Sequence, residues 1–339
     1  MKNRPVEEIV KPSGKGEITT IFSFVLSVLL VLNVALYYYF EKFDPRDWKF
    51  LAHIKWGILK NLNGPADWLI TGDSSGNQGI ETSPFKEELG ETAYNLCTIG
   101  PMLTLDDSWM LEYHINKYGP PKNVLMIHVY DLWNRKADHE VLSENPVTTI
   151  FKDGLGPDLG WSYSQKAKML SYRLFPIYSK HHGLKMLLSG EAKWFVPAAE
   201  VDSSGFNKRI LPKPDNVIKD TEGHIKFVKD SAFALSDECR MGLKHIKALV
   251  DKHNIELYIT MSPLHDSLYF NPYFQKYKNS IDSMLYDFAQ NDKHIHLINN
   301  PPMVFKAEEM DNSDHVVGKA SHTFTLHLIN EIKKIRAAK

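Results

Sequence analysis

The sequence contains little cysteine. Only 2 of its 339 residues are cysteines, Cys97 and Cys239. That number is too small for a disulfide scaffold or for a zinc module with four cysteine ligands. Cys97 lies in an apolar stretch, so we expect it to be a buried free thiol and not one half of a disulfide with Cys239.

The sequence also lacks an excess of charge of one sign. Its 40 Lys and Arg residues nearly balance its 41 Asp and Glu residues. A protein that neutralises nucleic-acid phosphates carries a basic excess, so we expect no nucleic-acid partner. The hydrophobic share of 43% and the charged share of 24% are typical of a globular chain, which excludes extended disorder.

Two common types of site motif are absent. The glycine-rich segment 69–79 lacks the Lys-Ser/Thr pair of a P-loop. The 15 histidines include no H-E-x-x-H helix. His181 and His182 are adjacent and point apart, while His294 and His296 lack a third ligand nearby. We therefore expect neither a metal nor a cofactor.

One long hydrophobic run is present. Residues 18–40 carry no charge and are long enough to cross a bilayer as a helix. The run ends in the aromatic residues 37–40, as at a membrane interface, and not in the small residues of a signal-peptide cleavage site. We predict a single-pass anchor in the cytoplasmic membrane, with the short basic tail 1–17 in the cytoplasm and the rest of the chain outside it.

The segment that follows the anchor, residues 41–66, has apolar residues at helical spacing between lysines. This pattern predicts a juxtamembrane amphipathic helix. The helix either lies in the membrane interface or packs on its own domain, and the pattern fits both.

Residues 67–339 alternate strand-like and helix-like segments, which is typical of a parallel sheet covered by helices. The predicted fold is therefore an α/β class domain with three layers, α/β/α, and a mostly parallel sheet. Residues 136–230 are rich in glycine and proline, and we interpret them as an insertion on the rim of the domain.

A serine follows the first strand of this domain. Ser74 lies between two glycines directly after an apolar run. Ligands collect at the carboxyl ends of strands in open α/β sheets, so Ser74 is a candidate nucleophile. Ser75 is the second candidate, and Asp73 is expected to cap the turn.

The other end of the chain supplies a candidate base. His315 directly precedes the last amphipathic helix. A serine nucleophile needs a base to take its proton, and the base needs an acid to fix its tautomer. Asp314 is adjacent to His315 and Asp311 is four residues before it, so the acid and the imidazole arrive on one loop.

The order of these residues resembles the SGNH (GDSL-type) hydrolase superfamily. The first block of that family, G-D-S after the first strand, is matched at residues 72–74. Its last block, D-x-x-H before the final helix, is matched at His315 but has Asn312 at the position of the acid. Three arrangements stay open: Asp311 or Asp314 is the acid, Asn312 holds the imidazole by a neutral hydrogen bond, or the site is a Ser-His dyad.

The resemblance also implies oxyanion and positioning groups. Gly100, in the segment after the second strand, matches the oxyanion glycine of the second block. The third block, G-x-N-D, is absent, and Asn134 or Asp131 is the candidate for its role.

Within that family, the anchor and the segments around Ser74 and Gly100 are most similar to the membrane-anchored envelope group. This group includes the D-alanyl transfer proteins and the SGNH proteins that work beside membrane-bound O-acyltransferases. The resemblance implies a serine acyltransferase or esterase that modifies an envelope polysaccharide or polymer through an acyl-Ser74 intermediate, with a membrane-bound O-acyltransferase as partner. The alternative is a non-catalytic accessory protein that docks such an acyltransferase.

Overall fold

The computed structural model describes residues 14–43, 50–143, 162–179, 201–208, 211–298 and 300–339, together with residues 181, 185, 188 and 189. The chain divides into two compact units. The first unit comprises residues 1–44 and 171–193. The second comprises residues 45–170 and 194–339 and is called the sheet unit below.

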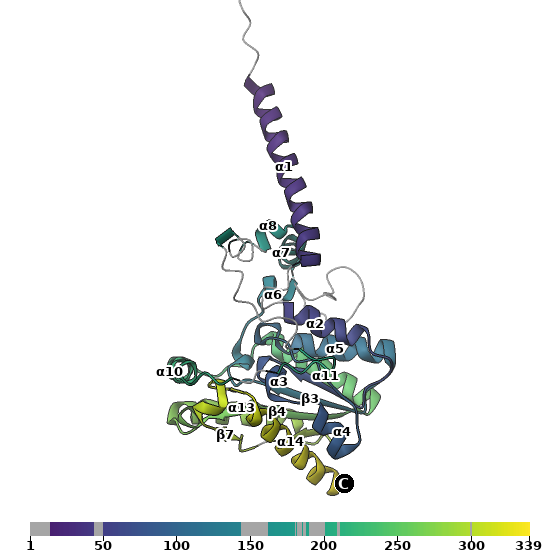
Figure 1. Cartoon of the computed structure of the whole chain (residues 1–339), viewed down its shortest axis with the longest axis vertical. Helices are drawn as coiled ribbons and strands as arrows, with labels where there is room; N and C mark the ends of the chain where they lie inside the picture. The colour runs from purple at the N-terminus through teal and green to yellow at the C-terminus, as the bar shows by residue number, and fades with distance from the viewer. Residues whose placement is uncertain are drawn as a thin grey trace, which may run out of the picture. The chain divides into compact units, whose positions relative to one another are not determined.

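The first unit contains helix α1 (Gly14–Phe43), drawn in dark purple in Figure 1. Its stretch Gly16–Tyr38 is long and apolar enough to cross a membrane. The apolar side chains of this stretch are exposed, which is what a lipid-facing helix requires. An N-terminal apolar helix of spanning length is thus confirmed, whereas its orientation stays a prediction. The unit also contains α8 (Pro176–Ser179) and the end of α7 (Tyr163–Leu174).

The sheet unit is built on five parallel strands in the order β2-β1-β3-β4-β6. The strands are β1 (Trp68–Gly72), β2 (Ala93–Asn95), β3 (Asn123–His128), β4 (Glu256–Met261) and β6 (Ile295–Leu297). The central strands β1 and β3 are buried along their whole length, because helices cover both faces of the sheet. The predicted α/β class with a mostly parallel sheet is confirmed.

Helices form a layer on each face of this sheet. Alternate residues of β3 divide between two apolar clusters: Val124 and Met126 belong to one, Leu125 and Ile127 to the other. The first cluster takes side chains from α2 (Phe50–Lys60), α5 (Leu103–Tyr118), α11 (Asp237–His253) and α13 (Pro272–Ala289). The second takes side chains from α4 (Ser83–Leu89) and α14 (Lys319–Ala337). In Figure 1, α2, α5 and α11 lie above the sheet, and α4 and α14 lie below it.

One further long helix, α10, and several short elements complete the sheet unit. They are α3 (Ser74–Gly79), η1 (Gly100–Met102), η2 (Leu132–Asn134), α6 (His139–Ser143), α10 (Pro214–Asp230), β5 (Leu264–His265), α12 (Asp266–Tyr269), β7 (Val304–Phe305), η5 (Ala307–Glu309), β8 (Met310–Asn312) and β9 (His315–Val316). β5 pairs with β7 in parallel, and β8 pairs with β9 as an antiparallel hairpin.

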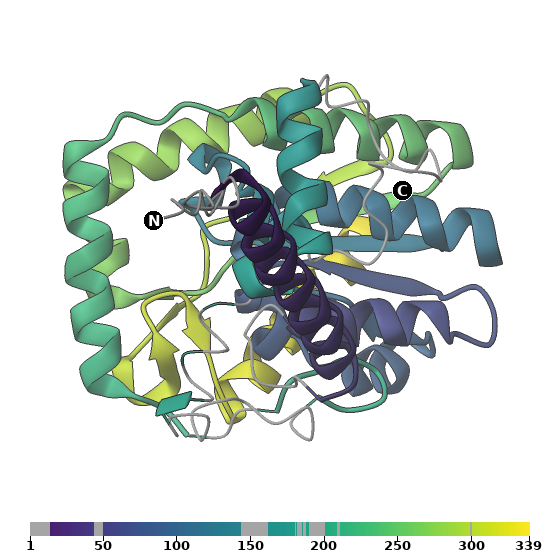
Figure 2. The ribbon, with the colours of Figure 1, turned by 90° about the horizontal axis from the view of Figure 1, so that it is seen from above.

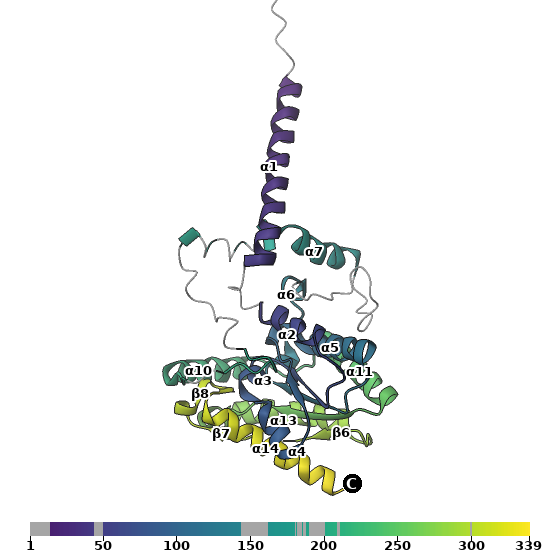
Figure 3. The ribbon, with the colours of Figure 1, turned by 45° about the vertical axis from the view of Figure 1, so that its right-hand side comes forward.

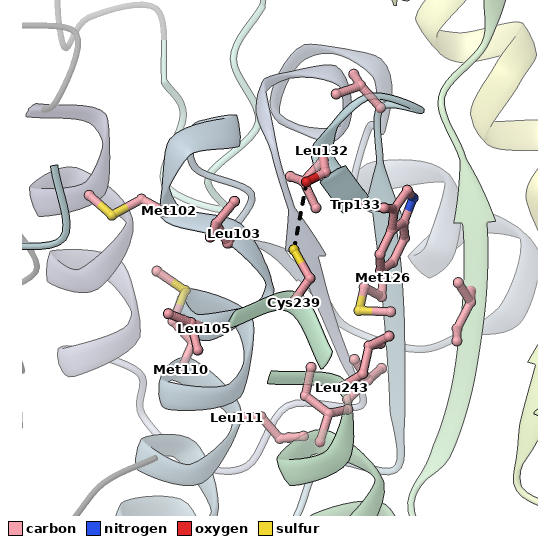
Figure 4. Close-up of a cluster of buried hydrophobic side chains, with 14 of the residues drawn as sticks. Met102, Leu103, Leu105, Met110, Leu111, Met126, Leu132, Trp133, Cys239 and Leu243 are labelled. Atoms are coloured by element: carbon pink, nitrogen blue, oxygen red, sulfur yellow. Dashed lines mark hydrogen bonds between the residues drawn. The ribbon is translucent and has the colours of Figure 1, made fainter. Parts of the chain in front are cut away.

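Both cysteines are buried free thiols, as expected. Figure 4 shows Cys239 inside the first apolar cluster, among side chains such as Leu103, Met126 and Leu243. Its Sγ lies 3.6 Å from the carbonyl oxygen of Leu132, to which the thiol donates. Cys239 therefore contributes to the packing of this face and is not available for a disulfide.

The segment after the anchor contains a helix, as its apolar spacing predicts. Within 41–66, helix α2 covers Phe50–Lys60, and residues 44–49 lie outside the described part of the chain. Trp56 and Leu59 are completely buried, and Trp56 Nε1 donates to Asp106 Oδ1 on α5 at 2.9 Å. Of the two alternatives for this helix, the structure favours packing on its own domain.

The predicted rim insertion 136–230 contains a long helix that the sequence analysis missed. α10 packs against β8 and α13. In Figure 2 this helix runs along one side of the sheet unit and starts beside the yellow β8–β9 hairpin. Pro214 in its first turn and the buried Val217, Thr221 and Val228 are the signals that identify it. Residues 144–161 and 190–200 of the insertion lie outside the described residues.

Candidate active site

Ser74 is presented by a tight turn between β1 and α3. Gly72, the last residue of β1, has φ +141°, and a Cβ there would lie 1.8 Å from the Ile127 carbonyl oxygen. Only glycine fits this position, so the strand can turn directly into the helix that begins at Ser74. β1 lies between β2 and β3, where the strand order reverses, which is the usual ligand position of a doubly wound sheet.

Asp73 caps this turn, as predicted. Its Oδ1 accepts hydrogen bonds from the Ser75 backbone N–H at 2.9 Å and from the Ser75 hydroxyl at 2.7 Å. Its Oδ2 accepts from the Val129 N–H at 2.7 Å, just beyond β3. The Ser75 hydroxyl is therefore committed to Asp73, which favours Ser74 over Ser75 as the nucleophile.

The β8–β9 hairpin brings His315 to Ser74. His315 Nε2 lies 2.8 Å from Ser74 Oγ, within hydrogen-bond distance. On the other side of the ring, His315 Nδ1 contacts Asp314 Oδ1. Ser74, His315 and Asp314 thus form the nucleophile, base and acid arrangement of a catalytic triad.

The other two candidates for the acid contact different groups. Asp311 Oδ1 pairs with Lys213 Nζ at 2.7 Å, and the negative charge of Asp311 helps to raise the pKa of His315. Asn312 Oδ1 accepts from the Asp314 N–H at 3.2 Å and stabilises the hairpin turn. The position that the family block assigns to the acid therefore holds a turn residue, and the carboxylate beside the imidazole comes from Asp314.

Asp314 and His315 stabilise each other's charged form. Burial opposes both charges, but contact with His315 outweighs it and lowers the pKa of Asp314. Contact with Asp314 likewise outweighs burial and raises the pKa of His315. Asp314 therefore stays ionised near neutral pH and stabilises the imidazolium that forms when His315 accepts a proton.

Two backbone N–H groups lie at helix starts near the site. Ser74 is the first residue of α3 and Gly100 is the first residue of η1. The first N–H groups of a helix have no acceptor inside it, so both are free of helical bonding. The predicted positioning group Asn134 is the last residue of η2, and its backbone N–H donates to the Asp131 carbonyl oxygen at 3.4 Å. Among the described residues, no hydrogen bond joins Asn134 to Ser74 or His315.

No protein-family model matches this chain, and no curated protein matches its sequence. The assignment of a function therefore depends on the geometry of the site itself.

A buried charged cluster beneath Ser74 was missed by the sequence analysis. His128, the last residue of β3, faces Asp73 Oδ2 at 3.4 Å and Asp107 Oδ2 at 2.7 Å. Burial favours the neutral ring, but the two carboxylates outweigh it and raise the pKa of His128 to about 9. For Asp73, burial opposes ionisation, but His128 and the N–H donors outweigh it and lower its pKa to about 2. A positively charged His128 thus holds the Asp73 cap in its ionised form.

Arg135 is the second missed residue. A Cβ added to Gly100 would lie 2.3 Å from Arg135 Nη1, so the guanidinium covers Gly100 directly. Its Nε and Nη2 donate to Asp131. Burial disfavours its charge, but Asp131, together with Asp73 and Asp314, raises the pKa of Arg135. Asp131, the alternative candidate for the positioning group, therefore binds the guanidinium of Arg135 and holds it beside the site.

Helix α10 holds the hairpin that carries His315. Asp220 Oδ2 accepts from the Ser313 N–H at 3.0 Å and from the Ser313 hydroxyl at 2.6 Å. His224 Nδ1 lies 2.7 Å from the same hydroxyl. Figure 3 shows α10 next to β8. Because the chain before α10 reads as glycine- and proline-rich, these positioning residues were not identified from the sequence.

A small cavity lies beside Asp314. Its volume is about 10 Å³, room for about one water molecule. Tyr130, Leu264 and Phe274 are among the side chains that line it. Within the described part of the chain, no group of three or more His, Cys, Asp and Glu side chains could hold a metal ion. His294 and His296 both contact Glu256, at 3.1 and 2.7 Å.

Proposed function

We propose that this protein is a membrane-anchored serine acyltransferase or esterase of the SGNH type. The observation that carries the proposal is the contact between Ser74 Oγ and His315 Nε2 at 2.8 Å, with Asp314 on the far side of the ring. The order of elements supports the family assignment, because Ser74 follows the first strand of the sheet and His315 directly precedes α14.

The reaction begins with attack of Ser74 Oγ on the carbonyl carbon of an acyl ester. His315 Nε2 takes the hydroxyl proton, and Asp314 stabilises the resulting imidazolium. The N–H groups of Ser74 and Gly100 stabilise the oxyanion of the tetrahedral intermediate. The carbon–oxygen bond to the leaving alcohol breaks, and His315 returns the proton to that alcohol. An acyl-Ser74 ester remains.

The second half repeats these steps with an acceptor. His315 removes the proton from an acceptor hydroxyl, whose oxygen attacks the acyl carbon. The bond to Ser74 Oγ breaks, and the proton passes through His315 back to Ser74. A water molecule as acceptor gives an esterase, whereas a hydroxyl of an envelope polymer gives a transferase. The predicted anchor α1 and the extracytoplasmic location favour a polymer of the cell envelope as substrate, with a membrane-bound O-acyltransferase as a partner.

Covalent labelling tests the proposal. The purified full-length protein in detergent micelles is treated with a fluorescent fluorophosphonate, which reacts with activated serines. We expect labelling of the wild type and none of Ser74→Ala or His315→Ala. Ser75→Ala is the matched control and keeps its labelling, because the Ser75 hydroxyl bonds to Asp73 and not to His315.

Two outcomes contradict the proposal. Labelling that persists in Ser74→Ala and disappears in Ser75→Ala identifies Ser75, and not Ser74, as the reactive serine. Folded wild-type protein that does not react at all indicates an inert site, and the accessory role beside an acyltransferase then replaces catalysis.

A further inference from the structure

A polar side chain of the anchor is buried where its neighbours are exposed. In α1, Asn33 is 8% exposed, whereas Leu32 and Val34 on either side are 49% and 48% exposed. Asn33 lies five residues before Tyr38, the end of the apolar stretch, which is about 8 Å along the helix axis. Another segment of the chain therefore covers the side of α1 on which Asn33 lies.

The covering segment is Ser171–Ser179, which belongs to the same unit as α1. Here α7 ends at Leu174, and α8 starts at Pro176. A break between helices leaves carbonyl and N–H groups without helical partners. Asn33 satisfies one of each: its Nδ2 donates to the Leu174 carbonyl oxygen, and its Oδ1 accepts from the Ile177 N–H at 3.5 Å.

The backbone donors across this break are all accounted for. The Phe175 N–H donates to the Ser171 carbonyl at 2.9 Å, and those of Tyr178 and Ser179 donate to the Phe175 carbonyl at 2.8 and 3.1 Å. Pro176 has no N–H, and Ile177 uses Asn33. In water, solvent satisfies such groups, whereas in a bilayer the protein must do so itself.

The outer surface of this segment is apolar and aromatic. Leu174, Phe175 and Tyr178 are 53%, 50% and 56% exposed. The ring of Tyr178 stacks on Tyr172, with centroids 5.1 Å apart. Tyrosine is enriched at the membrane–water interface, and α1, which contacts α8, also exposes apolar side chains.

We propose that Ser171–Ser179 is inserted in the lipid bilayer beside α1, near the end of the apolar stretch, with Leu174, Phe175 and Tyr178 in contact with lipid. The membrane-embedded part of the protein is then a helix with a short broken-helix companion, joined by Asn33. This inference rests on the anchoring by α1 in the proposed function and does not depend on the chemistry at Ser74.

A lipid-quenching experiment tests the inference. The full-length protein is reconstituted in phosphatidylcholine vesicles, and single cysteines carry the fluorophore NBD. The native Cys97 and Cys239 are buried, so an introduced exposed cysteine is labelled selectively. Probes are placed by Phe175→Cys and Tyr178→Cys, with Leu26→Cys in α1 as the membrane reference and Tyr286→Cys, an exposed position on α13, as the background.

The quencher is phosphatidylcholine with a spin label at one of two depths: near the headgroup end of the acyl chain for positions 175 and 178, and near the methyl end for the Leu26 reference, which lies in the middle of the apolar stretch. We expect the emission at positions 175 and 178 to fall about twofold, as for a group buried 5–10 Å in the interface, with no such loss at position 286. Adding Asn33→Ala to the Phe175→Cys protein is expected to reduce the quenching, because the break in the helix loses its partner.

The other outcomes overturn the inference in distinguishable ways. Quenching of the Leu26 probe without quenching at 175 and 178 keeps the anchor and indicates that the segment meets water or a protein partner. If the Leu26 probe is not quenched, α1 is not inserted in the membrane, and the proposed insertion of Ser171–Ser179 is contradicted as well. Equal quenching at position 286 shows that the quenching is not specific to Ser171–Ser179. Quenching at position 175 that Asn33→Ala does not change contradicts the role of Asn33.

Discussion

At the scale of single residues, two local patterns predict the contact between the proposed nucleophile and the proposed base, but they do not predict which residue is the acid. The glycine-flanked turn after the first strand and the histidine before the last helix identify Ser74 and His315. Asp314 becomes the partner of His315 only because Asn312 pairs with His315 across the hairpin and bonds the Asp314 N–H. Such a turn geometry is not encoded in residue spacing along the chain.

Replacing each acid separately tests this assignment. We expect Asp314→Asn to slow fluorophosphonate labelling by about 10³–10⁴-fold, because a neutral amide neither fixes the tautomer nor stabilises the imidazolium. Asp311→Asn is the matched control and changes the rate by only about two- to threefold, since Asp311 pairs with Lys213 and acts on His315 from a distance. A larger effect of Asp311→Asn than of Asp314→Asn contradicts the assignment. The rates are measured by gel fluorescence against time.

At the scale of elements, periodic segments were predictable and the irregular connection was not. The last amphipathic helix expected after His315 corresponds to α14. α11 (Asp237–His253) also has a local signal, because Ser236 caps it through the Cys239 N–H. α10 was missed since the prolines and glycines around it suggested a loop, although Pro214 is well placed in a first helical turn. Its contacts with β8 are long-range and leave no local pattern.

The role of α10 as a support for the hairpin can be tested at Asp220. Asp220→Ala removes both hydrogen bonds to Ser313. Because the hairpin then holds His315 less firmly, we expect labelling of Ser74 to slow by about tenfold, equivalent to about 1.4 kcal/mol. Asp215→Ala, at an exposed position of the same helix, is the control and leaves the rate unchanged. Equal rates for the two variants, measured under identical conditions, contradict the support role.

At the scale of the whole molecule, the alternation of strand-like and helix-like segments was sufficient to predict a mostly parallel sheet covered by helices. The buried charges inside that sheet were not predictable. His128 ends a strand whose other residues are mostly apolar, and its partners Asp73 and Asp107 come from two other elements. Only the assembled tertiary structure makes this cluster a stabilising one, since an unpaired buried charge is costly.

The cluster sets a pH window for stability. The pKa of His128 rises from 6.5 to about 9 in the folded protein, so its contribution is complete below pH 6.5 and is lost as the pH rises through 9. The pKa of Asp73 falls from 3.8 to about 2, so its contribution is complete above pH 3.8 and is lost as the pH falls through 2. Between these limits the cluster contributes a constant amount.

Urea denaturation at several pH values, followed by tryptophan fluorescence, measures this window. The buried Lys55 has a pKa lowered to about 7 and acts in the opposite direction in this pH range, so the contribution of His128 is taken as the difference between the wild type and His128→Gln. We expect this difference in the free energy of unfolding to favour the wild type at pH 6 and to fall by up to about 3 kcal/mol between pH 6.5 and 9.5. His322→Gln is the control, because His322 is a partly exposed partner of Glu81. An alkaline loss of the same size in His128→Gln and in the wild type refutes the role of the cluster.

Ser74 and His315, which are in contact in the candidate site, are separated by 241 positions in the chain. All five strands of the parallel sheet precede His315 in the chain and are synthesised before it. A chain that is truncated or cleaved near its C-terminus therefore lacks the base while it still contains the nucleophile. If Ser74 is the nucleophile, its reactivity therefore reports that the chain is intact as far as His315 and that the β8–β9 hairpin has folded against β1 and α3.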